Sequence, residues 1–290
     1  MNEDNKLKLH SLSDFQQFQE FISNSDSSKI RKEELSQILD QSEFSVAGHC
    51  HVCDHPVEFR VDYLSATGLM EEGKKIPNWR ECLVCPRCNL NNRMRAVIHL
   101  MESLGKTSQL DNIYITEQLT YLYQVLLSRY PNLIGSEFLG EHLNAGELNE
   151  NGIRHEDMTA LSFEDESFTS ILTFDVLEHI PDYQQALRES ARCLKKDGTL
   201  FLTAPFVITS NSTKVRASVG KDGQVTHHLP EEYHGDPTNP EAGILCYYHF
   251  GWDLLDQLIE AGFHRSCVNL YWSRKYGYFG GYQVIITAAK

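Results

Sequence analysis

Residues 168–206 read FTSILTFDVLEHIPDYQQALRESARCLKKDGTLFLTAPF, and this stretch decides the fold that the sequence predicts. It begins with an apolar run that stops at the carboxylate of Asp175, as expected for a buried strand followed by a functional loop. After Pro181, apolar residues recur at the three-and-four spacing that lays one helix face on a sheet. Residues 195–198 then provide a basic last turn and a glycine stop, and residues 199–203 form a second strand. One strand-helix-strand unit of this kind predicts a parallel sheet in an α/β protein.

The composition is that of an ordinary globular protein with an acidic surface. Of its 290 residues, 41% are hydrophobic and 10% aromatic, and 26 basic residues stand against 40 acidic ones for a formal charge of -14. A surface of this sign repels polyphosphate, which disfavours broad nucleic-acid binding. The first residues lack the basic head and apolar run of a secretory signal, and no apolar run reaches membrane-spanning length. We therefore expect a cytoplasmic protein with no membrane partner, and the sequence does not indicate its oligomeric state.

Three regions are expected along the chain. Residues 1–45 are polar with two weak helical patterns, which is typical of a pair of short helices or of a partly mobile lead-in. Residues 46–105 hold a cluster of cysteines followed by a helical pattern, and residues 106–290 alternate strand and helix patterns. Within the last region the periodicity lapses over about residues 205–250, which are rich in proline and histidine. A segment this long without periodicity predicts a functional loop, here a substrate loop.

Two Cys-x-x-Cys knuckles predict a structural zinc site, because four thiolates fill the tetrahedral coordination of Zn²⁺ and leave no open position for catalysis. The expected ligands are Cys50, Cys53, Cys85 and Cys88. Cys82 lies three residues before Cys85 and is an alternative member of the second pair. Other alternative ligands are His49, His51 and His55, and reduced cysteines without a metal are the plainer interpretation.

Carboxylates recur where successive predicted strands end. The strands expected near residues 113, 133, 153 and 168 each stop at an acid, and these acids are Glu117, Glu137, Asp157 and Asp175. In an open parallel sheet the carboxyl ends of the strands form the ligand crevice, so a binding site is expected there. Asp175 and Glu178 are also residue types that stabilise the start of a helix, which is their alternative role.

The segment FDVLEHI at 174–180, the turn LKKDG at 194–198 and the strand into APF at 204–206 resemble the second half of a class I S-adenosylmethionine-dependent methyltransferase of the type 11 group. The resemblance covers about residues 110–290. It implies a Rossmann-like sheet of seven strands with the last one antiparallel, preceded in this chain by a small zinc-ribbon-like module. It also implies S-adenosyl-L-methionine as cofactor and methyl transfer (EC 2.1.1) as the reaction.

The resemblance assigns cofactor-binding residues position by position. Glu137 matches the acid that accepts hydrogen bonds from both ribose hydroxyls, and a carboxylate suits that role because it accepts two. Asp157 and Met158 match the pair at the adenine edge. Asp175 and Val176 match the loop under the methionine moiety of the cofactor.

Glu117 matches the acid that opens the cofactor loop, and Gln118 and Thr120 from the same loop are further cofactor-binding candidates. Leu119 and Tyr121 stand where the family has glycines, which let the backbone approach the cofactor closely. Because of this departure, a non-catalytic zinc-containing scaffold is one alternative to an enzyme.

The expected function is methyl transfer to a small-molecule or saccharide acceptor, in which the protein mainly aligns the reactants. His234 is the leading candidate base, and His179 and Tyr233 are further catalytic candidates. An RNA methyltransferase that binds RNA through the zinc module is the leading alternative, although the acidic balance makes nucleic acid the less favoured partner. The basic residues that would serve RNA are Arg80, Arg87, Arg93 and Arg95, and a solvated first turn is the alternative role of the last two.

Overall fold

The computed structural model describes residues 4–22, 26–64, 68–105, 108, 111–140 and 142–290. The chain forms two compact units, each built from separate stretches of sequence. Unit 1 comprises Met1–Leu9, Ser13–Thr107 and Asn269–Ile285, and unit 2 comprises His10–Leu12, Ser108–Val268 and Ile286–Lys290. Residues 269–285, expected to lie in the α/β region, thus group with the cysteine-rich region. Residues 1–3 and 23–25 of the predicted lead-in lie outside the described residues.

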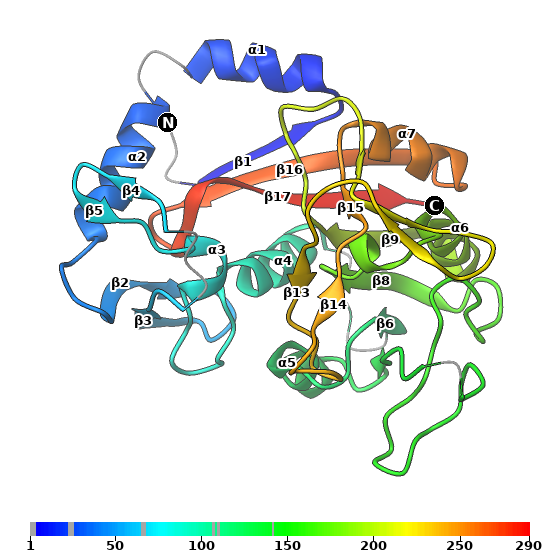
Figure 1. Ribbon diagram of the computed structural model, residues 1–290. Helices are drawn as coiled ribbons and strands as arrows, with labels where there is room; N and C mark the ends of the chain where they lie inside the picture. Colours follow the sequence, from blue (N-terminus) through cyan, green and yellow to red (C-terminus); the bar gives the residue numbers. More distant parts are fainter. Residues whose placement is uncertain (1–3, 23–25, 65–67, 106–107, 109–110, 141) are drawn as a thin grey trace. The chain divides into compact units, whose positions relative to one another are not determined.

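A seven-stranded mixed sheet organises the fold (Figure 1). In sheet order its strands are β1 (Asp4–Leu9), β16 (Arg265–Ser273), β17 (Tyr278–Ala289), β9 (Leu194–Thr203), β8 (Phe168–Phe174), β6 (Ile113–Ile115) and β7 (Ile134–Gly135). Strand β6 pairs in parallel with β7 and β8, β8 pairs in parallel with β9, and β17 is antiparallel to β9. The predicted α/β fold, with a Rossmann-like sheet of seven strands and an antiparallel last strand, is confirmed.

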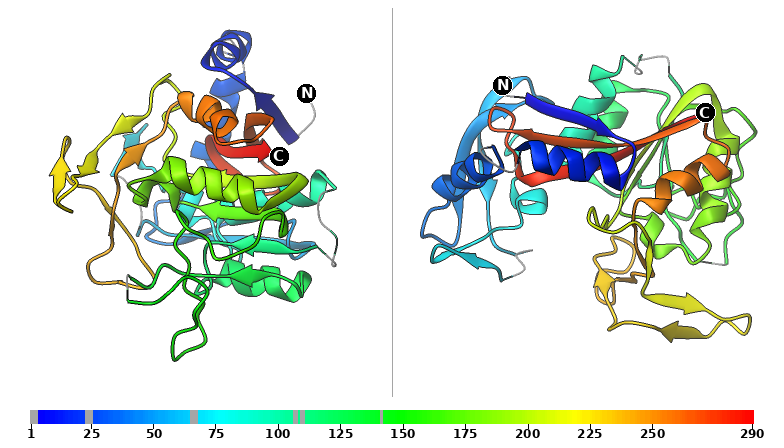
Figure 2. Two further views of the ribbon diagram at one scale, coloured as in Figure 1. Left: turned by 90° about the vertical axis from the view of Figure 1, so that its right-hand side faces the viewer. Right: turned by 90° about the horizontal axis from the view of Figure 1, so that it is seen from above.

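Strands β8 and β9 lie side by side, as Figures 1 and 2 show, with Ile171 opposite Leu200 and Leu172 opposite Phe201. Both strands are buried along most of their length, which is why each contains an apolar segment, Ile171–Leu172 in β8 and Leu200–Leu202 in β9. Helix α6 (Tyr183–Cys193) connects them and begins after Asp182, whose carboxylate accepts the N–H of Gln185. It buries the apolar face that the three-and-four spacing predicted, so this helix is confirmed.

The end of α6 differs from the prediction. The helix stops before the two lysines at 195–196, so both lie in β9 and the basic residue of the last turn is Arg192. The left-handed position that was expected of a glycine stop is taken by Asp197, whose φ is +62°. Gly198 is needed for another reason, because a Cβ there would lie 2.7 Å from the carbonyl oxygen of Lys195.

The strand predicted near Ile153 does not form, and this prediction is wrong. The side-chain oxygen of Asn149 accepts the backbone N–H groups of Asn151 and Ile153 at 2.9 and 3.0 Å, which makes a turn of the segment. A single parallel bridge between Glu137 and His155 takes the place of the strand. The sheet reaches seven strands through β1 instead, which the polar amino-terminal sequence did not predict.

The segment without periodicity, from about residue 207 to 250, is held by main-chain pairing in three short antiparallel ladders. They pair β10 (Lys214–Val215) with β15 (Tyr248–His249), β11 (Ala217–Val219) with β12 (Val225–His227), and β13 (Tyr233–His234) with β14 (Ile244–Leu245). The remaining elements of unit 2 are α5 (Tyr121–Arg129), the 3-10 turn η1 (Leu177–His179) and α7 (Asp253–Glu260). This segment therefore places its histidines on defined backbone positions.

Unit 1 contains the hairpin of β2 (Phe44–Cys50) and β3 (His55–Val61), whose turn carries the first cysteine knuckle. Helix α4 (Asn92–Ser103) follows the second knuckle and begins after Asn91, whose side chain accepts the N–H of Met94. This helix confirms the helical pattern expected after the cysteines, within residues 46–105. The other elements are α1 (Leu12–Ile22), α2 (Asp26–Gln37), β4 (Met70–Glu71), β5 (Lys74–Lys75) and α3 (Trp79–Cys82).

Candidate functional site

Asp175 stands at the carboxyl end of β8 in the left-handed backbone conformation, which is uncommon for residues other than glycine, with φ at +54°. Its N–H donates to the carbonyl of Thr203 at 2.8 Å, and its Oδ1 accepts from the Thr203 hydroxyl at 3.0 Å. Thr203 is the last residue of β9, so the carboxylate is fixed at the ends of two adjacent parallel strands. A left-handed residue over-determined in this way is typical of a functional site. Val176 follows it and immediately precedes η1.

Glu137 follows β7 and holds the loop that comes after β6. Its Oε1 accepts the backbone N–H groups of Gln118 and Leu119 at 2.7 and 2.9 Å. Burial raises the pKa of Glu137, with the two N–H groups opposing the rise and the Asp236 carboxylate adding to it. Within the described part of the chain its Oε2 accepts no hydrogen bond, so this oxygen keeps its capacity to bind a ligand hydroxyl.

Gln118 and Thr120 fix the backbone of the same loop. The side-chain oxygen of Gln118 accepts the N–H of Arg154 at 2.9 Å, and its amide nitrogen donates to the carbonyl of Gly152 at 3.3 Å. The hydroxyl of Thr120 accepts the N–H of Tyr123 at 3.2 Å and so caps α5. The side chains of these two predicted cofactor residues thus hold the loop in position.

The bulky residues at the expected glycine positions do not fill the interior of this loop. Leu119 is 44% exposed and Tyr121 59% exposed. Close backbone approach is provided by Gly135 of β7, where a Cβ would lie 2.5 Å from the ring of Tyr123 and 2.8 Å from the carbonyl oxygen of Glu117. Glu117 itself is half-buried at the start of the loop.

Asp157 and Met158 lie just beyond the bridge residue His155. The Asp157 carboxylate accepts both the backbone N–H and the hydroxyl of Thr159 at 2.7 Å, which forms a local turn. Met158 is buried. The structure thus places the predicted adenine pair in a fixed turn, although the strand expected to carry it is absent.

A cluster of one carboxylate and two imidazoles lies in unit 2, and we call Glu178, His179 and His234 the histidine–glutamate cluster. The first two residues end η1, and His234 comes from β13. Nδ1 of His234 lies 3.2 Å from Nε2 of His179 and 3.4 Å from Oε1 of Glu178. Nε2 of His179 lies 3.7 Å from the same Glu178 oxygen. The structure therefore brings together two of the three predicted catalytic residues and adds an acid that the sequence suggested only as a helix cap.

A second layer of polar residues surrounds the cluster. Oε1 of Glu232 accepts from Nε2 of His234 at 3.1 Å and from Nε2 of His249 at 3.0 Å, while its Oε2 pairs with Arg216 at 2.9 Å. Cys246 is buried, and its thiol interacts with both imidazoles. Neither Glu232 nor Cys246 belongs to a motif in the sequence. The sequence indicates them only through the many acids and histidines between residues 227 and 249. Which of these side chains come into contact depends on the pairing of β13 with β14.

The electrostatics of the two cluster imidazoles differ. The Cys246 thiol and the carboxylates of Glu178 and Glu232 raise the pKa of His234 to about 11, whereas burial lowers the pKa of His179. At pH 7 His234 is therefore charged and His179 neutral. Tyr233, the third predicted catalytic residue, is 54% exposed and lies outside the cluster.

The chain after His234 extends from the cluster toward the predicted ribose acid. The Asp236 carboxylate is close enough to Glu137 to raise the pKa of that group. The Asp175 carboxylate likewise raises the pKa of His179, against the larger effect of burial.

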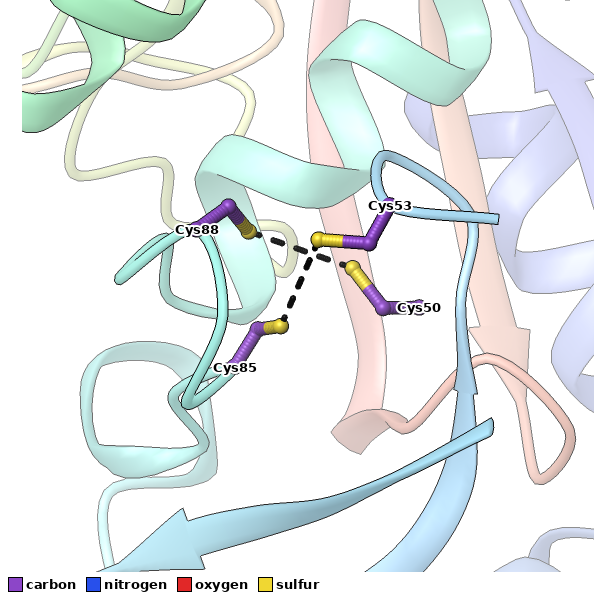
Figure 3. Close-up of side chains that lie close together, drawn as sticks. All are labelled: Cys50, Cys53, Cys85 and Cys88. Carbon is purple, nitrogen blue, oxygen red and sulfur yellow. Dashed lines mark hydrogen bonds between the residues drawn. The ribbon is translucent and has the colours of Figure 1, made fainter. Parts of the chain in front are cut away.

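Four sulfur atoms meet in unit 1, as Figure 3 shows for the side chains of Cys50, Cys53, Cys85 and Cys88. The sulfur of Cys50 lies 3.9 Å from that of Cys88, and the sulfur of Cys53 lies 3.8 Å from that of Cys85. Thiolates each about 2.3 Å from a tetrahedral zinc ion lie about 3.8 Å apart, so the donor set and its spacing fit Zn²⁺.

The alternative zinc ligands are engaged elsewhere. Cys82 is buried in α3 and is not a member of the sulfur cluster. The imidazoles contact other partners: Asp54 for His49, Glu102 for His51, and the Cys53 carbonyl for His55.

The arginines beside the cysteines form part of unit 1 rather than a solvated first turn. Arg95 is fully buried and donates to the carbonyls of Tyr276, Gly277 and Leu83 at 2.6, 3.1 and 3.2 Å. Its guanidinium also lies 4.0 Å from the ring centre of Phe59. Two further arginines, Arg80 and Arg93, pair with the carboxylate of Glu81, and Arg87 is exposed.

Among the described residues, no helix combines the length and apolar character needed to cross a membrane.

No curated protein matches this chain. The chain is similar to solved S-adenosylmethionine-dependent methyltransferases at low identity. One from Mesorhizobium loti shares 12% identity with a TM-score of 0.41, over 70% of this chain and 100% of that one. Another from Methanosarcina mazei shares 15% identity with a TM-score of 0.39, over 65% and 96%. The Burkholderia thailandensis 1,6-didemethyltoxoflavin-N1-methyltransferase shares 16% identity with a TM-score of 0.36, over 68% and 77%.

A family model described as a methyltransferase domain matches residues 121–202. This range begins at the first residue of α5 and ends within β9, so it contains Glu137, Asp157, Asp175 and the Glu178–His179 pair. The chain is thus similar to methyltransferase domains over this range.

Proposed function

We propose that this protein transfers the methyl group of S-adenosyl-L-methionine to a small-molecule or saccharide acceptor. The observation that carries the proposal is the methyltransferase-domain match over residues 121–202, within which Asp175 is held in a left-handed conformation at the carboxyl end of β8. The carboxyl ends of parallel strands are where α/β sheets bind ligands.

The cofactor would be held by the acids at the strand ends. Oε2 of Glu137 would accept from the ribose hydroxyls while Oε1 keeps the loop in place. Asp157 and Met158 would border the adenine, and Asp175 with Val176 would face the methionine moiety. When bound, the sulfonium supplies a methyl group with a good leaving group, so the contribution of the chain is to align the acceptor and exclude water.

The histidine–glutamate cluster is proposed to lie on the acceptor side. A protonated imidazole cannot accept a proton, and His234 is charged at pH 7 because its pKa is raised to about 11. As long as its Nε2 binds no cation, His179, whose pKa is lowered by burial, is thus the better base for a hydroxyl acceptor. Tyr233, which is exposed, would contribute to acceptor binding rather than to proton transfer.

A small acceptor is favoured over RNA by the state of the arginines. Arg95 is buried, and Arg80 and Arg93 are paired with Glu81, so these side chains do not form a free phosphate-binding surface. The formal charge of -14 acts in the same direction.

The four cysteines of unit 1 are proposed to hold a structural Zn²⁺ ion. Their sulfur separations of 3.8 and 3.9 Å match tetrahedral thiolate coordination. Four filled positions leave no site for a reacting water or substrate, so the ion would stabilise the knuckles only. A cytoplasmic location, where thiols stay reduced, is part of the same proposal.

Titration calorimetry with S-adenosyl-L-methionine tests the proposal and separates it from a non-catalytic scaffold. We expect saturable binding to one site, and weakening by at least about tenfold in Glu137→Gln, because a hydrogen bond to a charged group contributes about 1.5–3 kcal/mol. Glu150→Gln, an exposed acid of the same unit, is the matched control and should bind normally. Absence of binding by the wild-type protein would favour the scaffold.

The acceptor class is tested with methyl-labelled cofactor. Label should pass to a component of a pool of hydroxylated small molecules and sugars, and not to total RNA. Label found in RNA, together with salt-sensitive RNA binding, would favour the alternative activity.

A further inference from the structure

We propose that the histidine–glutamate cluster of unit 2 binds a divalent transition-metal ion, in a site separate from the four cysteines. The ligands would be one carboxylate oxygen of Glu178, Nε2 of His179 and Nδ1 of His234. These three donors come from two elements, η1 and β13, that are more than fifty residues apart in the sequence.

When both imidazoles are neutral, their hydrogen bonds leave one unprotonated nitrogen on each ring facing the cluster. Nδ1 of His179 lies 2.7 Å from the carbonyl oxygen of Leu245, which can only accept, so Nδ1 carries the proton and Nε2 a lone pair. Nε2 of His234 lies 3.1 Å from the Glu232 carboxylate and donates to it, which leaves a lone pair on Nδ1 in the neutral ring. A carboxylate that orients a histidine from behind is the usual arrangement at metal sites.

Glu178 provides a separate observation that points to a ligand. Its side chain is 0% exposed, and neither carboxylate oxygen accepts a hydrogen bond. A buried acceptor without a partner costs about 1–3 kcal/mol, and more when it is charged. A cation placed between this carboxylate and the two imidazole nitrogens would remove that cost.

The spacing of the three donor atoms fits one ion. They are separated by 3.2, 3.4 and 3.7 Å. Ligand atoms about 2.1 Å from a common ion lie about 3.0 Å apart at right angles and about 3.4 Å apart at the tetrahedral angle. A point about 2.1 Å from all three atoms therefore exists without displacement of the side chains.

The donor set selects the class of ion. Two imidazoles and one carboxylate suit Zn²⁺, Mn²⁺, Fe²⁺ or Co²⁺, and not the harder Ca²⁺. Three protein ligands leave open coordination positions, in contrast to the filled cysteine site. The competing occupant is a proton shared by the two imidazoles, which the high pKa of His234 would favour when no ion is bound.

The test is equilibrium dialysis of the full chain against Zn²⁺, Mn²⁺ or Co²⁺ in separate samples, with bound metal counted by elemental analysis. The wild-type protein should retain one ion per chain more than Glu178→Gln and more than His234→Gln. His227→Gln, a histidine of β12 outside the cluster, should retain as much as the wild type. Counting differences between variants removes the contribution of the cysteines.

Equal metal content in the wild type and both cluster variants, for all three ions, would overturn the proposal and leave the shared proton as the occupant. Circular dichroism verifies that each variant is folded. The thermal midpoint provides a second readout, because added metal should raise the midpoint more in the wild type than in Glu178→Gln, which keeps only the cysteine site. Metal binding is measured without cofactor or acceptor, so its failure is distinguishable from failure of the proposed methyl transfer.

Discussion

Replacement of Arg95 by methionine should destabilise unit 1 strongly, because Arg95 supports the second cysteine knuckle from behind. The variant loses hydrogen bonds to three carbonyl groups, at Leu83, Tyr276 and Gly277. Each buried carbonyl left without a donor costs about 1–3 kcal/mol, or about 3–9 kcal/mol together. The variant no longer buries a charged guanidinium, and the desolvation free energy avoided in this way offsets several kcal/mol of the loss. We therefore expect a net loss of about 2–4 kcal/mol, a large part of the ~5–15 kcal/mol typical of a domain.

Urea unfolding followed by tryptophan fluorescence measures this loss. Two of the three tryptophans, Trp79 and Trp272, lie in unit 1, so a Trp252→Phe background restricts the signal to that unit. Arg87→Met, which removes an exposed arginine from the same knuckle, is the control and should change the stability by no more than about 0.5 kcal/mol. If the midpoint of the Arg95 variant equals that of the control, the structural role assigned to Arg95 is refuted.

Three further predictions concern the cofactor loop, Glu137 and the cysteine zinc site. Gly135→Ala should weaken cofactor binding measured by calorimetry, because the added Cβ would lie 2.5 Å from the ring of Tyr123. Gly235→Ala, which has open space around it, is the control and should bind the cofactor normally. Equal cofactor affinities of the two variants would contradict the packing argument. Burial raises the pKa of Glu137, so protonation of this carboxylate stabilises the folded state. The free energy of unfolding of the wild type, relative to Glu137→Gln, should therefore fall as the pH rises from about 4.5 through the higher pKa of the folded state. A difference in urea midpoints that does not depend on pH would count against this. Elemental analysis should find zinc lost in Cys85→Ala and retained in Cys82→Ala. The reverse result would make Cys82 the zinc ligand in place of Cys85.

The elements that the sequence predicted well are those whose burial follows a regular period. Helix α6 and strands β8 and β9 have one face or both faces covered, and their apolar residues recur accordingly. Strand β1 is largely polar, and the strands of the ladders between residues 207 and 250 are only two or three residues long, so neither shows an apolar period. The segment at Ile153 failed as a strand because the side chain of Asn149 turns the backbone there.

The sequence predicted those residues of the candidate site whose position depends only on their neighbours along the chain. Asp175 and Glu137 are recognisable because each directly follows a strand. Glu178 belongs to a cluster because His234 of β13 contacts it, and these two residues are far apart in the sequence. Arg95 shows the same limit, because the pattern of its helix does not reveal that a segment near residue 276 covers it.

The composition of unit 1 has a consequence for the order in which the protein folds during synthesis. Its first part ends at Thr107, yet Arg95 and Glu34 bond to backbone groups of residues 276–281. At about 5–20 residues per second, the ribosome needs on the order of 10–30 s to make the intervening chain. During that interval residues 13–107 are already made but lack the segment that covers the cysteine knuckles, so unit 1 is completed only after most of unit 2 has been synthesised.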